Sequence, residues 1–179
     1  MVLGVDKLKK LVKEINLVEA LGPRDLENPE GAGFDLRLGE VFEISGETVL
    51  AIEKRKTVES KSVAKYKEGK SEFITIEPGD FYLGKTIESV NLPDSLAATL
   101  HPRSTTFRSG LWLGTTQIAP GYRGPLTFSI KNLGPSNVKI ELGARVLHVM
   151  FWEVAGKGAS YRGQWQGGRV TSKGEEKQV

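Results

Sequence analysis

The sequence predicts an all-β fold, a sandwich or jelly-roll barrel, with one short helix at the N-terminus. After Leu21, Gly and Pro interrupt the chain every eight to twelve residues. Between them, short runs alternate apolar and polar residues in steps of two, which is the period of a strand with one buried face. Many short strands joined by Gly and Pro turns are typical of sandwiches and barrels.

The helix is predicted near the start of the chain. Apolar residues recur there at i, i+3, i+4 and i+7, as Leu8, Leu11, Val12 and Ile15. This spacing places them on one face of an α-helix. Asp6 is the residue expected to cap its N-terminus.

The strands follow in the rest of the chain. Two turns are predicted between them, at residues 77–80 (EPGD) and 133–136 (LGPS), because Pro and Gly with Asp or Ser favour hairpin loops. The alternating runs that predict strands are 34–38 (FDLRL), 41–44 (VFEI), 73–76 (FITI), 81–87 (FYLGKTI), 126–130 (LTFSI), 138–142 (VKIEL) and 146–151 (VLHVMF).

A length of 179 residues is that of about one domain, so residues 1–179 are interpreted as a single domain. Residues 53–72 are charged and have little apolar content, which predicts a solvated loop or excursion. Residues 160–179 are Gly-rich and then charged, with too few apolar side chains to pack alone. We expect them to form a mobile C-terminal tail that closes over a site.

Composition excludes several classes of function. The net charge of +3 is spread thinly, so no nucleic-acid partner is expected. The absence of Cys excludes disulfides and thiolate metal sites, and no run approaches the ~20 apolar residues of a membrane span. We expect a cytoplasmic protein. His101 and His148 are too far apart in sequence to predict a metal site, and no P-loop is present.

Three segments have the residue types of a phosphate or nucleotide site. Residues 103–106 (RSTT) combine a guanidinium, hydroxyls and backbone amides, and Arg108 follows. Residues 117–124 contain a Pro-Gly turn followed by Tyr122, whose ring can lie against a sugar or base. Residues 161–169 combine aromatic, amide and Arg side chains in a segment that could act as a lid.

Taken together, these motifs resemble the family of dUTPases and dCTP deaminases, and most closely its archaeal dUTPase-type members. The resemblance covers nearly the whole chain in the family's order. It implies a distorted jelly-roll β-barrel of the dUTPase type, and a homotrimer with sites between subunits. It also implies Mg²⁺ bound through the triphosphate of a deoxypyrimidine nucleotide, dUTP or dCTP. The motifs are 33–39 (GFDLRLG), 92–96 (LPDSL), 103–108 (RSTTFR), 118–124 (IAPGYRG), Asn132, 143–145 (GAR) and 161–166 (YRGQWQ).

The resemblance also implies roles for single residues. No residue is expected to bind the metal directly, and Asp35 would support it from a distance or serve the structure. Arg103 and Ser104, with Thr105 beside them, would bind the phosphates of the substrate. The backbone of Gln117 and Ile118 would bind its pyrimidine edge, and Tyr122 its deoxyribose. Gln166, with Tyr161 and Arg162, would close over the base or phosphates. Arg108 matches the arginine that helps order the deaminase site.

Two catalytic positions depart from the family pattern. Ser129 stands where the deaminases have the carboxylate that moves protons between water, N3 and the leaving ammonia, and a hydroxyl cannot act as that base without a partner. Ala119 stands where the hydrolases have the Asp that orients the attacking water. Losing a positioned general base costs ~10²–10⁴ in rate. His148 replaces a usual Gln and is interpreted as a packing residue.

The sequence therefore leads us to expect an enzyme, a dUTP diphosphatase that forms dUMP and pyrophosphate. Two alternatives stay open. One is a dCTP deaminase, alone or combined with dUTP hydrolysis. The other is a catalytically silent nucleotide-binding paralogue. Whether Ala119 is natural or engineered also stays open, as does the transfer of water activation to Asp35, Glu88 or His148.

Overall fold

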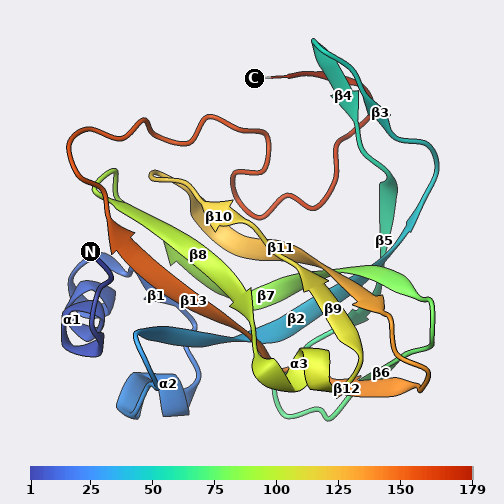
Figure 1. The fold of residues 1–179 in the computed structure, drawn as a ribbon, viewed down its shortest axis with the longest axis horizontal. Coiled ribbons are helices and arrows are strands. Elements are labelled where there is room, and N and C mark those ends of the chain that lie inside the picture. The colour runs from blue at the N-terminus through green and yellow to red at the C-terminus, as the bar shows by residue number, and fades with distance from the viewer. Residues whose placement is uncertain (179) are drawn as a thin grey trace.

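The computed structural model describes residues 1–178 and confirms the predicted class of fold (Figure 1). Most of the strands form one nine-stranded antiparallel sheet that curls into a half-barrel. Its strands are β1 (Val18–Glu19), β2 (Gly33–Ser45), β5 (Glu59–Lys65), β7 (Phe81–Asn91), β8 (Leu96–Pro102), β9 (Leu111–Gly114), β10 (Gln117–Ile118), β11 (Arg123–Asn132) and β13 (Arg145–Glu153). A small second sheet joins β6 (Phe73–Ile76) to β12 (Val138–Glu141).

The strand order of the large sheet is β10-β8-β13-β2-β7-β11-β9, with β5 beside β2 and β1 beside β7. The long strand β2 connects the two sides of the half-barrel. Its first part pairs with β13, and its later part pairs with β7 and β5. The register of β2 shifts between Leu38 and Glu40 and again between Val41 and Phe42, and such irregularities bend a strand.

Two positions of β2 require glycine because the backbone of a neighbouring strand passes very close to them. A Cβ atom at Gly33 would lie 2.0 Å from the carbonyl oxygen of Val149, and one at Gly39 would lie 2.8 Å from the amide nitrogen of Ile87. Only a residue without a side chain fits at such distances. The two glycines that bound the segment GFDLRLG therefore have a structural reason.

The apolar residues of the alternating strands meet inside the curled sheet and form the core. Phe34 of β2 and Phe151 of β13 are at most 1% exposed, and their rings pack edge to face with centroids 6.4 Å apart. Burial of aromatic side chains of this size is a large share of core stabilisation. Other large side chains of the core that are buried almost completely include Leu8, Leu17, Leu36, Leu38, Val41, Ile76, Leu92, Ile130 and Leu147.

The predicted N-terminal helix is α1 (Val5–Ile15), which buries Leu8. The prediction of its cap was wrong. Gly4 occupies the cap position without a side-chain hydrogen bond, and Asp6 lies in the first turn, where a carboxylate favours the helix dipole. Two short helices were not predicted: α2 (Pro23–Glu27) and α3 (Ser104–Arg108).

The predicted turn at residues 77–80 closes as expected. Gly79 has a φ of +90°, and the backbone amide of Asp80 donates to the carbonyl of Glu77 at 3.0 Å. The side chain of Asp80 accepts a further hydrogen bond from the amide of Glu77 at 2.8 Å. None of the three helices in residues 1–178 is long and apolar enough to cross a membrane.

The charged segment 53–72 contains more regular structure than its composition predicts. Its middle forms β5, which pairs with β2 and exposes most of its side chains. Its start forms β4 (Lys54–Lys56), which pairs with β3 (Val49–Leu50) on one side and with the C-terminal β14 (Glu176–Lys177) on the other. Figure 1 shows the C-terminal segment running from the end of β13 to this small three-stranded sheet.

Candidate functional site

A cavity of about 480 Å³ lies where the ladder between β9 and β11 opens. The last pair of that ladder is Ser129 with Gly114, after which the chain leaves β11 and joins β8 through Gln117 and Ile118. The ladder pocket, as we name this cavity, thus has β10 on one side and the start of β11 on the other. Its lining comprises Thr116, Gln117, Ile118, Ala119, Tyr122, Leu126, Thr127, Tyr161, Trp165, Arg169 and Val170.

The C-terminal segment forms the third wall of the ladder pocket because it is bonded to the Pro-Gly turn. The amide of Tyr161 donates to the carbonyl of Pro120 at 2.7 Å. The side chain of Gln166 accepts from the amide of Arg123 at 3.0 Å and donates to the carbonyl of Gly121 at 3.1 Å. Both ends of the Gln166 amide are therefore used to hold the segment, which is consistent with a closing role for this residue.

Tyr122 is a fixed part of the pocket wall. Its side chain is 7% exposed, its hydroxyl donates to the carbonyl of Pro125 at 2.7 Å, and its ring packs edge to face on Tyr161 with centroids 5.4 Å apart. Burial raises the pKa of Tyr122 to about 12. A neutral, rigid ring at this point suits contact with an uncharged sugar or base.

Of the two positions that depart from the family pattern, Ala119 lines this pocket and Ser129 is not part of its lining. Ser129 follows Thr127 by two residues on the same face of β11, and its hydroxyl accepts a hydrogen bond from the amide of Gly114 at 3.1 Å. The hydroxyl of Thr127 is buried and has no hydrogen-bond partner within residues 1–178. The lining, as far as the structure describes it, contains hydroxyl, amide and guanidinium groups but no carboxylate.

The expected phosphate-binding residues lie elsewhere in the same chain. Arg103 and Ser104 follow β8 at the end remote from β10, at the start of α3 (Figure 1). Ile118 pairs with Ala98, and Ala98 is about 13 Å from Pro102 along an extended strand. Within one chain the structure therefore does not bring these residues to the ladder pocket.

Arg103 is instead part of an ion-pair cluster around Asp35, whose side chain is 3% exposed. The carboxylate of Asp35 also binds Arg24 at 3.2 Å, Arg145 at 3.0 Å and the Nδ1 atom of His148 at 2.9 Å. Burial first, and then the charge of Arg103, lower the pKa of His148, which favours a neutral imidazole. Asp35 acts here as the centre of a charge network.

Ser104, Thr105 and Arg108 are exposed on or beside α3. The guanidinium of Arg108 lies 5.6 Å from the ring centroid of Phe107. A second cavity, of about 360 Å³, adjoins the start of this helix and is lined by Arg103, Ser104, Asp35, His101, His148, Glu30, Gly31, Pro102 and Met150. In the motif RSTTFR, Ser104, Thr105 and Arg108 are therefore exposed, whereas Thr106 is buried and its hydroxyl donates to the carbonyl of Arg103 at 2.6 Å. None of these residues lines the ladder pocket of the same chain.

Glu88, one of the groups considered for water activation, is also bound elsewhere. Its carboxylate is completely buried and accepts from the Nε atom of Arg37 at 2.6 Å and from the backbone amide of Arg37 at 2.8 Å. Burial raises the pKa of Glu88, and Arg37 opposes that rise. Glu88 joins β7 to β2 and does not line the ladder pocket.

The donor set does not fit a magnesium ion held by the protein. Within the part of the chain that the structure describes, no three His, Asp or Glu side chains converge as a metal site. Mg²⁺ prefers carboxylate and other oxygen ligands, and the ladder pocket offers no carboxylate. Magnesium carried on a triphosphate stays a prediction.

Sequence reasoning missed part of the pocket lining. Thr127 could have been found, because it shares the outward face of β11 with Ser129 in a clear two-residue alternation. Trp165 and Arg169 lie in the segment 161–169 that was interpreted as a lid, but the Gly-rich tail has no periodicity from which its path, or the position of Val170, could be predicted. Their position follows from the bonds that the tail makes to the Pro-Gly turn and to β4.

Fold and site together define a class of protein. The curled antiparallel half-barrel is the dUTPase-like fold, and the crystal structure of 2′-deoxycytidine 5′-triphosphate deaminase from Agrobacterium tumefaciens shares it. That structure matches with a TM-score of 0.64 at 19% sequence identity and covers 84% of this chain and 46% of that one. At this identity the likeness shows the fold.

Sequence comparison identifies the family. Residues 2–154 match the family model described as dCTP deaminase-like, and the protein belongs to this family. The dCTP deaminase of Pyrobaculum calidifontis is 31% identical over 170 residues, which are 94% of this chain and 93% of that protein. The "dCTP deaminase, dUMP-forming" of Sulfurihydrogenibium sp. is 32% identical over 174 residues, 96% of this chain and 95% of that protein.

The family predicted from the motifs is therefore confirmed, but the main function expected from them was wrong. Curated relatives that match almost the whole chain are named dCTP deaminases, so the expectation of a plain dUTP diphosphatase is not supported. The expectation rested on the order of the motifs, which most closely resembled archaeal dUTPase-type members, and on the absence of the deaminase carboxylate at Ser129. A single position that departs from a pattern can lower an activity without moving the rest of the chain to another branch.

Proposed function

We propose that this protein binds dCTP in the ladder pocket and that any reaction it carries out is a slow hydrolytic deamination of the cytosine ring. One observation carries the proposal. The pocket lies where a β-ladder ends at the pair Ser129–Gly114, between a strand edge and the Pro-Gly turn. A pyrimidine has donors and acceptors along one edge, so it can occupy such an opening much as a further strand residue would. The names of the relatives support cytosine as the base.

The phosphates of dCTP are expected to meet a second copy of the chain. Arg103 and Ser104 are remote from the ladder pocket of their own chain. Ser104 is exposed, so a neighbouring copy could present this segment to the pocket. We therefore propose a homotrimer, in which three such contacts close a ring. Analytical ultracentrifugation tests this, and a monomer at micromolar concentration would contradict it.

The reaction rate is expected to be low because the site lacks a proton-transfer group. Deamination adds water at C4 of the cytosine and releases ammonia, and protons must move between water, N3 and the leaving nitrogen. Ser129 matches the position of the group that makes this transfer in the family, but it has only a hydroxyl, and one lone pair of its oxygen already accepts a hydrogen bond from the amide of Gly114. General acid–base groups contribute about 10²–10⁴ to rates. We therefore expect the wild-type protein to deaminate dCTP about 10²–10⁴ times more slowly than a variant with a carboxylate at position 129.

The test combines binding and turnover. Calorimetry with dCTP measures binding, and ammonia release measures deamination. Ser129→Glu is expected to raise ammonia release by about 10²–10⁴, whereas the uncharged Ser129→Gln is expected to leave it unchanged. Absence of dCTP binding by the wild-type protein would end the proposal. Equal ammonia release by the wild type and the Glu variant would show that another group moves the protons.

A second candidate function is binding without turnover, such as sensing the nucleotide. One observation favours binding without turnover. Positions 119 and 129, where the family has catalytic carboxylates, hold Ala and Ser, while the chain still forms a walled pocket. It predicts dCTP binding with no ammonia from the wild type at any pH. Measurable ammonia from the wild-type protein would exclude it.

A further inference from the structure

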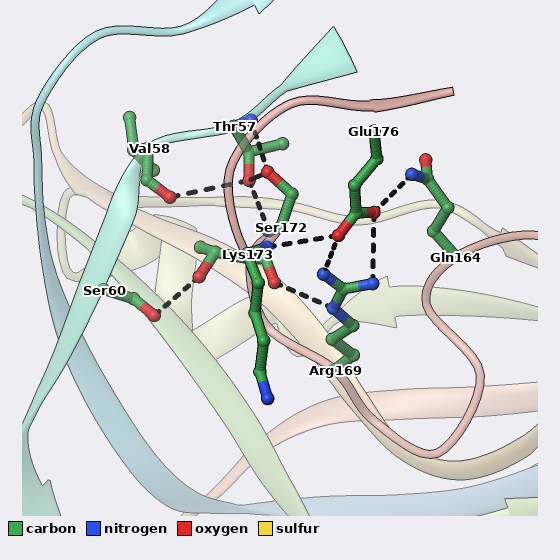
Figure 2. A network of polar contacts seen from close by, with 9 residues as sticks. Thr57, Val58, Ser60, Gln164, Arg169, Ser172, Lys173 and Glu176 are labelled. Carbon is green, nitrogen blue, oxygen red and sulfur yellow. Dashed lines mark hydrogen bonds and ion pairs between the residues drawn. The ribbon is translucent and has the colours of Figure 1, made fainter. Parts of the chain in front are cut away.

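The charged groups of the C-terminal segment bind one another. Both terminal nitrogens of Arg169 bind the carboxylate of Glu176, and its Nε atom donates to the carbonyl of Thr171 at 3.1 Å (Figure 2). Among the described residues that line the ladder pocket, Arg169 is the one with a formal charge at neutral pH. Because Glu176 compensates this charge, the ladder pocket has no surplus positive charge for a phosphate group. Another part of the molecule has such a surplus.

The second cavity, of about 360 Å³ beside α3, adjoins a cluster with more positive than negative charge. Three guanidinium groups bind the carboxylate of Asp35: those of Arg24 in α2, of Arg103 directly after β8, and of Arg145 in β13. Glu30 binds Arg24 at 2.8 Å, so two carboxylates face three guanidinium groups. A concave site with an excess of positive charge attracts anions.

His148 lines this cavity with one ring nitrogen bonded and the other open. Its side chain is 23% exposed, and its Nδ1 atom lies 2.9 Å from the Oδ1 atom of Asp35. Asp35, bound by three guanidinium groups, is an ionised acceptor, so Nδ1 carries the hydrogen of this bond. In the described part of the chain the ring makes no other hydrogen bond. The Nε2 atom lies beside Gly31 and Gly33, which have no side chains to cover it, and Gly31 also lines the cavity.

The proton on Nε2 determines how His148 acts on an anion. In the neutral ring, Nε2 presents a lone pair, which repels a phosphate oxygen. In the charged ring both nitrogens donate, so Nε2 becomes a charge-assisted donor. Burial first, and then the charge of Arg103, lower the pKa of His148, whereas Asp25 of α2 and Glu30 oppose that effect. A phosphate group bound beside Arg103 adds negative charge, which raises the pKa of a histidine.

We propose that His148 is a proton-dependent binding residue for phosphate groups in the second cavity, beside Arg103 and Ser104. With a proton on Nε2, it donates to a phosphate oxygen, so the affinity of the cavity for phosphate groups rises as the pH falls. The inference rests on the proposed function for the source of these groups, which is the nucleotide in the ladder pocket of a neighbouring copy. It replaces the interpretation of His148 as a packing residue.

The first experiment follows the ring protons of the histidines by NMR, which is simple because the chain has two of them. The full-length wild-type protein is titrated from about pH 5 to pH 8 alone, with inorganic pyrophosphate and with dCTP. Either ligand is expected to raise the titration midpoint of His148 by about one pH unit, which corresponds to about tenfold in affinity. This measurement needs no variant that could fail to fold.

His101 is the internal control for the titration. It lines the same cavity and stands opposite His148 in the ladder of β8 and β13. Its Nε2 atom, however, is bonded to the hydroxyl of Thr99 at 3.0 Å. Its midpoint is therefore expected to move much less than that of His148, and His101→Gln assigns the two signals.

The second experiment measures the affinity for pyrophosphate by calorimetry. The ratio of the wild-type affinity to that of His148→Gln is expected to rise about tenfold from about pH 8 to about pH 5.5. The charge of pyrophosphate also changes over this range, but it does so for both proteins, so the ratio isolates His148. His101→Gln is the matched variant and should follow the wild type.

The outcomes separate this inference from the proposed function. If dCTP binds and the midpoint of His148 does not move, the inference is overturned and the proposed function stands. If pyrophosphate raises the midpoint and dCTP does not bind, the inference holds for the cavity and the proposed function fails. If the midpoint moves with neither ligand, or moves equally for His101 and His148, His148 has no specific part in phosphate binding.

Discussion

Removal of the Tyr122 hydroxyl tests whether the wall of the ladder pocket depends on one buried polar contact. The hydroxyl donates to the carbonyl of Pro125, next to the point where the register of β11 shifts against β7. Tyr122→Phe keeps the ring and its contact with Tyr161 but removes this donor. A hydrogen bond contributes about 0.5–1.5 kcal/mol, and a buried group without a partner costs about 1–3 kcal/mol. We expect the free energy of unfolding to fall by about 1–2 kcal/mol at neutral pH.

The sign of this difference is expected to change in alkali. Burial is the main cause that raises the pKa of Tyr122 from 10 to about 12 in the folded protein. Because the folded state holds this proton more tightly than the unfolded state, wild-type stability is full below pH 10 and falls as the pH rises toward 12. Two pKa units at 1.36 kcal/mol each correspond to about 2.7 kcal/mol. Phe does not titrate, so the variant should become the more stable protein by about 1 kcal/mol.

The assay is urea denaturation of both proteins at several pH values from neutral to pH 12, with tyrosinate absorbance recorded in parallel. Other groups titrate in both proteins, so the difference between them isolates Tyr122. The wild type should be more stable than Tyr122→Phe at neutral pH and less stable than it near pH 12. A difference that stays constant with pH would refute the reasoning, because it would mean that Tyr122 is not protected from deprotonation by burial.

Three further changes test other parts of the structure. Thr127→Val removes a buried hydroxyl without a partner in the described residues and should raise the unfolding free energy by about 1 kcal/mol in thermal denaturation; a loss would mean that water satisfies the hydroxyl. Gly124→Ala places a Cβ atom 2.7 Å from the backbone of Gly167 at a φ of +127° and should speed proteolysis of the C-terminal segment, unlike the control Gly79→Ala, which meets open space. Asp35→Asn leaves its Arg partners without their shared carboxylate and should cost about 3 kcal/mol in urea denaturation; a change below about 1 kcal/mol would show that solvent screens the cluster.

Much of the fold could be predicted because its signals are local. The period of Leu8, Leu11 and Ile15 predicts α1, and the two-residue alternation in segments such as 126–130 predicts β11. The helix α3 was missed because residues 103–106 have the composition of a turn, and only the hydroxyl of Thr106 bonding back to the carbonyl of Arg103 reveals how the helix starts. Strand β5 was missed because its exposed edge carries polar side chains on both sides of the alternation.

The candidate site also has a part that the sequence predicts and a part that only the structure reveals. The motifs placed Ala119, Tyr122 and Gln166 at one site, and the structure brings them together through the bonds between the tail and the Pro-Gly turn. The resemblance placed Arg103 and Ser104 at a site shared between subunits, and within one chain β8 separates these residues from the pocket; that they meet the pocket of another subunit stays a prediction. No pattern in the sequence pointed to the pair Arg169–Glu176, because its partners on β4 are more than a hundred residues away.

The sequence by itself determined the all-β class, the family and the departures at positions 119 and 129, because each of these depends on residue type and short spacing. Only the tertiary structure decided that the ladder of β9 and β11 opens beside Thr127, that Asp35 binds three arginines, and that the C-terminal segment returns to β4. These features depend on which distant segments share a backbone ladder or a buried charge. Such contacts are fixed by the packing of the whole half-barrel, and a local pattern does not specify them.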